Sequence, residues 1–118
     1  MYILVTNNPL TLSLSSSIVT TQYCDMSFMD VLLRVRDFIH MGHTLLTHPL
    51  SGSVKPNETL YKSVLISEKV SDVDESSVII IGEAILKTQS FAPRVIPEKY
   101  KKDLQEVDLS LIRSVVNF

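Results

Sequence analysis

The N-terminal segment, residues 2–6, constrains the fold more than any other part of the chain. Its sequence, Tyr-Ile-Leu-Val-Thr, is apolar or β-branched throughout and is followed at once by Asn7, Asn8 and Pro9. Such an unbroken run is typical of a strand buried on both faces, as in α/β proteins with a largely parallel sheet. The segment therefore predicts a central sheet that is covered on both sides.

Three further segments are predicted as strands. Residues 18–23 and 61–67 are rich in Val, Ile and Thr, whose branched Cβ atoms favour the pleated backbone. Residues 45–47 form a short strand core that Pro49 ends. Residues 10–14 alternate Leu with Thr or Ser, a pattern that suits a strand and a helical turn equally.

Three segments are predicted as helices. The first begins at Ser27, whose hydroxyl can cap a helix, and ends at Gly42, which can adopt the left-handed conformation. The second begins near Asp72; its β-branched residues 78–81 also suit a short strand, but the helical stripe is preferred. The third begins at Pro97, and its apolar residues recur at helical intervals. They are Tyr100, Leu104, Val107, Leu111 and Val115.

The order of these elements predicts the fold class. Buried strands alternate with amphipathic helices, which indicates an α/β domain with a mostly parallel sheet of about four strands flanked by helices, a Rossmann-like α/β/α sandwich. The 118 residues fit one domain, residues 1–118. The direction of the fourth strand stays open, because no helix precedes it and an antiparallel partner is allowed.

Charge and cysteine content exclude several classes of function. The chain has 11 basic and 13 acidic residues, a net charge of −2, so nucleic acid and anionic membrane surfaces are not expected partners. Its apolar runs are far shorter than the roughly 20 residues of a membrane helix, and no basic segment precedes the first of them. A single cysteine, Cys24, predicts a protein of a reducing compartment, and we expect it in the cytoplasm.

The connection at residues 48–58 is the segment most suggestive of function. It contains Pro, Gly, Ser and Asn without a helical or strand period, and long loops of this kind are often functional. Ser51 and Ser53 flank Gly52, where a backbone can approach a ligand closely, and the cation of Lys55 follows. This combination suits a phosphate or a carboxylate. The alternative is two consecutive turns that satisfy only their own backbone.

The predicted strand arrangement adds two asparagines to this candidate site. If the strands at residues 2–6 and 45–47 are parallel neighbours, their carboxyl ends bring Asn7 and Asn8 close to the loop. The candidate ligand-binding residues are therefore Asn7, Asn8, His48, Ser51, Gly52, Ser53, Lys55 and Asn57.

His48 is the candidate catalytic residue. It opens the loop and could act as a general base on a substrate that Lys55 holds, although a structural role beside the following proline is the more ordinary one. No metal site is predicted, because the first helix ends between His40 and His43 and their imidazoles do not share a helical face. No phosphate-loop or dinucleotide motif is present, so no cofactor is expected.

Two stretches resemble a known family. Val-Thr-Asn-Asn-Pro-Leu at residues 5–10 and Gly-His-Thr-Leu-Leu-Thr-His-Pro-Leu-Ser-Gly-Ser-Val-Lys-Pro-Asn-Glu-Thr at residues 42–59 look like the GrdX family, although the family has Pro where this chain has Leu60. The resemblance implies an accessory protein encoded with the glycine, sarcosine and betaine reductase systems of anaerobic amino-acid-fermenting bacteria. It supplies no catalytic residues to transfer.

Three hypotheses of function follow. The leading one is a non-catalytic accessory protein of a glycine reductase system that binds a small anion or a reductase component through residues 48–58. The rival is a small enzyme acting on a phosphorylated or carboxylated metabolite with His48 and Lys55. The third is a homodimer formed through the C-terminal helix.

Overall fold

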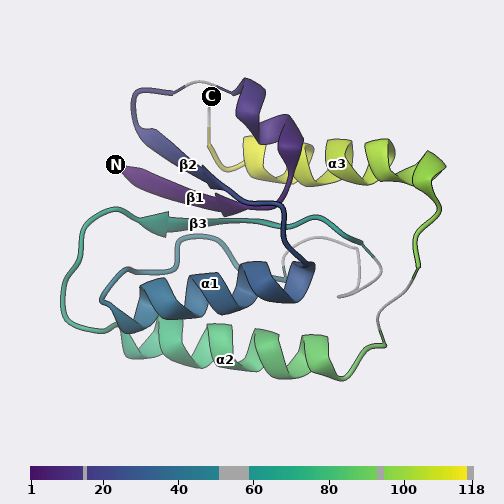
Figure 1. Cartoon of the computed structure of the whole chain (residues 1–118). Helices are drawn as coiled ribbons and strands as arrows, with labels where there is room; N and C mark the ends of the chain where they lie inside the picture. The colour runs from purple at the N-terminus through teal and green to yellow at the C-terminus, as the bar shows by residue number, and fades with distance from the viewer. Residues whose placement is uncertain (15, 51–58, 93–94, 117–118) are drawn as a thin grey trace.

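The computed structural model of the chain describes residues 1–14, 16–50, 59–92 and 95–116. A three-stranded sheet lies between two helical layers, with α1 and α2 on one face and η1 and α3 on the other (Figure 1). The elements in chain order are β1 (Tyr2–Thr6), the 3₁₀ helix η1 (Pro9–Ser13), β2 (Val19–Tyr23), α1 (Phe28–His40), β3 (Ser63–Ser67), α2 (Glu75–Gln89) and α3 (Glu98–Arg113). The predicted α/β class with helices on both faces is confirmed.

The sheet itself differs from the prediction. Its order is β2-β1-β3, and β1 pairs in parallel with β2 but antiparallel with β3. The described sheet is therefore mixed and three-stranded, so the predicted four-stranded, mostly parallel, Rossmann-like sheet is wrong. The reason lies in the path of the chain after α1. Residues 44–47 pair antiparallel with β3, so the chain reverses its direction once more before it enters β3.

The predicted strand at residues 45–47 is an isolated bridge. Leu45 pairs with Ile66, and the amides of Leu46 and Thr47 both donate to the carbonyl of Leu65 (2.9 and 3.3 Å). Because two amides converge on one carbonyl, the regular ladder does not continue. This bridge runs antiparallel to β3 along its outer edge, so residues 45–47 do not neighbour β1 as predicted.

The helix ends confirm the local sequence signals. Ser27 caps α1 by accepting a hydrogen bond from the Asp30 amide (3.1 Å), and Gly42, just beyond the helix, has a φ of 111°. Asp74 caps α2 by accepting from the Ser77 amide (3.0 Å), so the 78–81 run is helical. The open segment 10–14 is resolved as η1, with Asn8 as its cap.

The two faces of the sheet explain the unbroken N-terminal run. Ile3 and Val5 pack toward α1 and α2, whereas Leu4 packs toward α3. Every interior position of β1 is therefore buried, as the sequence predicts for a strand between two layers.

Candidate functional site

A narrow cleft, partly open to solvent and with about 20 Å³ of free space, lies between α3, the start of α1 and the chain that leads into β3. We call it the Lys62 cleft; its lining residues are Phe28, Leu50, Thr59, Tyr61, Lys62, Leu104, Val107, Asp108 and Leu111. Leu50 and Thr59 are the described residues on either side of residues 51–58. The two described residues that flank 51–58 thus both line this cleft.

Lys62 is the buried cation of the cleft. Only 6% of its surface is exposed. Removal from water disfavours the charged ammonium and lowers the pKa of Lys62, while the negative charge of Asp108 opposes this effect in part. The lysine therefore bears a net cost of desolvation that a further negative charge in the cleft would reduce.

Asp108 lies beside Lys62, and its carboxylate is hydrogen-bonded to other elements of the fold. Its carboxylate accepts hydrogen bonds from the Ser63 amide (3.0 Å), the Ser63 hydroxyl (2.6 Å) and the Asn8 side-chain amide (3.0 Å). The hydroxyls of Ser63 and Thr6 also share a hydrogen bond (2.7 Å). We call these four buried residues the polar junction. It connects β1, β3, η1 and α3 directly beneath the cleft.

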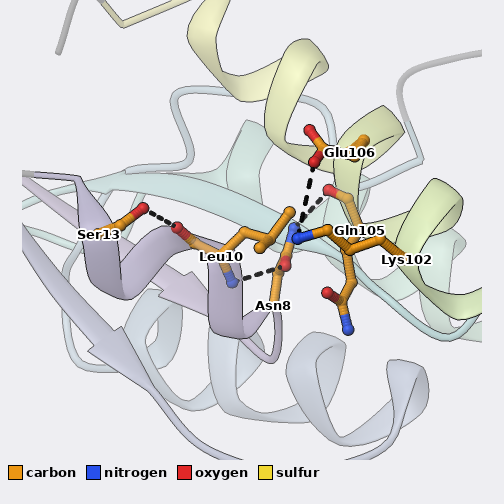
Figure 2. A network of polar contacts seen from close by, with 6 residues as sticks. All are labelled: Asn8, Leu10, Ser13, Lys102, Gln105 and Glu106. Carbon is orange, nitrogen blue, oxygen red and sulfur yellow. Dashed lines mark hydrogen bonds and ion pairs between the residues drawn. The ribbon is translucent and has the colours of Figure 1, made fainter.

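Asn8 forms the η1 side of this junction. Figure 2 shows its side chain extending from the start of η1 to α3, where Nδ2 donates to the Gln105 carbonyl (2.9 Å) while Oδ1 accepts from the Leu10 amide (3.1 Å). Nearby on α3, Lys102 and Glu106 form an exposed ion pair at 3.8 Å. Asn8 is fully buried and joins two elements.

Asn7 fixes the chain that follows the loop. Its Nδ2 donates to the carbonyls of Met26 (2.9 Å) and Leu60 (2.6 Å), and its Oδ1 accepts from the Lys62 amide (2.8 Å). Both asparagines thus have buried structural partners, and their binding of a ligand stays a prediction. The strand pairing that motivated their proximity to residues 48–58 is wrong, and that proximity stays a prediction because residues 51–58 lie outside the described residues.

His48 does not line the Lys62 cleft. It is exposed, and its Nδ1 accepts a hydrogen bond from the Leu50 amide (3.1 Å), which is the geometry of a turn. Five other predicted site residues lie outside the described residues; they are Ser51, Gly52, Ser53, Lys55 and Asn57. Among the described candidates, Asn7 and Asn8 therefore bond to the cleft residues Lys62 and Asp108, but neither of them nor His48 lines the cleft.

Sequence reasoning missed Lys62 and Asp108. A signal for Asp108 was present: it lies four residues after Leu104 and four before Ile112, so its charge interrupts the apolar stripe of the last helix. For Lys62 the signal was a charged residue directly before a buried strand. Neither signal alone indicates that the two side chains line one cleft.

Across residues 1–14, 16–50, 59–92 and 95–116, no group of three or more His, Cys, Asp or Glu side chains is arranged to hold a metal ion. Over the same ranges, no helix has both the length and the apolar character needed to cross a bilayer.

The fold and the cleft define a small mixed α/β protein in which a buried lysine lies above a buried polar junction. The chain belongs to the GrdX family: the model of the GrdX-like protein family matches residues 3–117, a range that includes Lys62, Asp108 and all of the sheet except Tyr2. The resemblance found in the sequence is thereby confirmed. Neither the curated proteins nor the solved structures contain a match to the chain.

Proposed function

We propose that this protein is a non-catalytic accessory factor of a glycine reductase-type system that binds a small carboxylate or phosphate compound in the Lys62 cleft. Membership of the GrdX family supports the association with the reductase. The observation that supports binding is the burial of Lys62 in an open cleft, because a buried cation gains from a second negative charge.

The cleft walls restrict the ligand to a small one. Leu104, Val107 and Leu111 supply an apolar wall from α3, and Thr59 and Tyr61 bring hydroxyl groups. A few polar groups among apolar walls are usual for small-molecule sites, and the free space of about 20 Å³ admits a group about the size of one water molecule. We expect one anionic group of the ligand to enter beside Lys62, with the rest of the ligand on the surface of α3.

Binding is favoured over catalysis by the positions of the candidate bases. Asp108 already accepts three hydrogen bonds from Ser63 and Asn8, so its carboxylate oxygens are occupied by structural partners. His48 lies on the surface and does not line the cleft. The enzyme hypothesis with His48 and Lys55 is therefore second to the binding hypothesis.

The same proposal places the protein in the cytoplasm. Its one cysteine, Cys24, is free and exposed, which suits a reducing compartment where thiols persist.

The experiment is thermal unfolding against phosphate, acetyl phosphate, glycine, sarcosine and betaine. We expect at least one compound to stabilise the protein, by about 2.7 kcal/mol at 100 times its dissociation constant. The shift should disappear in Lys62→Met and persist in Lys69→Met, since Lys69 is exposed and outside the cleft. A shift that survives Lys62→Met but is lost in Lys55→Ala would move the site to the loop, and no shift with any compound would refute small-anion binding.

A further inference from the structure

The strand β2 forms an open edge of the sheet. It pairs with β1 alone, and the bonds from the Tyr2 amide to the Ile18 carbonyl and from the Cys24 amide to the Thr6 carbonyl set its orientation. Because N–H and C=O groups alternate in direction along a strand, the backbones of Val19, Thr21 and Tyr23 point away from β1. Within the described chain, these outward groups have no hydrogen-bond partner.

The opposite edge of the sheet, at β3, is covered by other residues of the chain. Residues 44–47 cover β3, with the Leu46 amide donating to Leu65 and the Ser67 amide donating to Thr44, both at 2.9 Å. Proteins usually also protect exposed edges with charges, proline or bulges. The β2 sequence, Val-Thr-Thr-Gln-Tyr, contains no charge and no proline, and its register with β1 is continuous.

The helical layers leave access to this edge. On one face α1 packs against β1 and β3, and the β2 side chains on that face, Thr20 and Gln22, are polar and exposed. On the other face, η1 packs beside β2 and presents Leu12 with 62% of its surface exposed. A hollow partly open to solvent lies beside this strand, lined by Thr21 and Tyr23 of β2 and by Arg34 of α1.

We propose that two copies of this chain associate through their β2 strands, antiparallel and centred on Thr21. In this register each Thr21 lies opposite the partner's Thr21, and Val19 lies opposite the partner's Tyr23. Threonine pairs and pairs of an aromatic with a β-branched residue are favourable across strands. All outward groups are then paired, because Val19, Thr21 and Tyr23 each face a residue with which they exchange two bonds.

These features favour a second copy of the chain as the partner that pairs with β2. A two-fold axis brings the same uncharged surface against itself, so no like charges meet across the strands. The association converts two three-stranded sheets into one continuous six-stranded sheet and removes both open edges. It uses a surface separate from the Lys62 cleft and does not depend on the proposed function.

Disulfide crosslinking tests the register directly. In a Cys24→Ser background, Thr21→Cys places two thiols on Cα atoms about 5.5 Å apart, within disulfide range. Thr20→Cys is the matched control, since in this register residue 20 faces the partner's Gln22 and the two thiols are too far apart. We expect covalent dimers from Thr21→Cys alone; equal yields from both variants, or none from either, would refute the register.

Sedimentation of the unmodified chain over a concentration series tests the association itself. We expect a reversible monomer–dimer equilibrium that is lost in Thr21→Pro, which removes an outward amide but no bond to β1. The melting temperature of this variant should stay near that of the unmodified chain. A monomer at every concentration, or a dimer that Thr21→Pro leaves intact and Thr21→Cys does not crosslink, would overturn the proposal; the latter would indicate another surface, such as α3.

Discussion

The carboxylate of Asp108 on α3 accepts hydrogen bonds from both the amide and the hydroxyl of Ser63, the first residue of β3 and 45 residues earlier in the chain (3.0 and 2.6 Å). This contact fixes α3 against the end of the sheet where the Lys62 cleft opens. Within the described residues, no buried side-chain polar atom lacks a partner, so the junction beneath the cleft is complete.

Asp108→Ala should destabilise the protein by about 3 kcal/mol, because it leaves the Ser63 amide buried without an acceptor and weakens the attachment of Asn8. Chemical denaturation measures the change. Glu106→Ala is the matched control on the same helix; it removes only an exposed ion pair and should cost less than about 0.5 kcal/mol. Similar costs for the two variants would contradict the structural role of the junction.

The stability of the protein should rise with pH in the alkaline range because of Lys62. Burial lowers the pKa of Lys62 below its ordinary value of 10.5, so between the two values the unfolded chain binds more protons than the folded one. The free energy of unfolding then increases by up to about 1.4 kcal/mol per pH unit as the burial cost of the ammonium disappears.

The Lys62→Met variant isolates this effect. It should be at least as stable as the unmodified protein at pH 7, because the desolvated charge is gone. It should also lack the part of the increase in unfolding free energy at alkaline pH that Lys62 causes. Lys69→Met should keep that part of the increase. Denaturant melts from pH 7 to about 11 give the comparison, and parallel curves for the unmodified protein and Lys62→Met would show that Lys62 does not bear a desolvation cost.

Two glycines should respond oppositely to alanine. A Cβ at Gly42, whose φ is 111°, would lie 2.2 Å from the Ser71 carbonyl oxygen, so Gly42→Ala should cost at least about 2 kcal/mol. Gly82 lies inside α2 with open space around it, and Gly82→Ala should stabilise by about 0.5–1 kcal/mol. Thermal melts suffice, and a neutral Gly42→Ala would contradict the close approach of the chain at Ser71.

Asn8→Ala should cost about 2 kcal/mol. It removes the cap of η1 and both donations to α3, to the Gln105 carbonyl and to Asp108. Ser13→Ala, at the other end of η1, removes one exposed hydrogen bond to the Leu10 carbonyl and serves as the control. Denaturant melts compare the two variants, and an equally small loss in both would show that Asn8 does not hold α3 in place.

Local features of the fold were predictable from the sequence because their causes are local. The cap at Ser27, the left-handed Gly42 and the first turn at Glu98 depend on residues within one or two helical turns. The pairing of the strands was not predictable in this way, because the direction of β3 depends on how residues 43–62 return, and no periodic pattern marks that path.

The site was predictable only in part, for the same reason. The sequence indicated the end of β1 and residues 48–58; of the chain around that loop, Leu50 and Thr59 line the Lys62 cleft, and the binding residues proposed there stay a prediction. The residues that define the cleft, Lys62 and Asp108, are far apart in the chain and come together only through the docking of α3 on β3. A single charged residue on an apolar stripe indicates burial but not its partner.

The pKa of the Lys62 amine tests most directly whether the Lys62 cleft binds an anion. NMR at the Lys62 Cε follows this pKa in a titration with and without each compound of the panel. We expect a pKa below 10.5 for the free protein that rises when a carboxylate or phosphate compound binds, because the added negative charge favours the ammonium. A Lys62 pKa that no compound changes, while Lys55 or an exposed lysine responds, would contradict the assignment of the Lys62 cleft as the binding site.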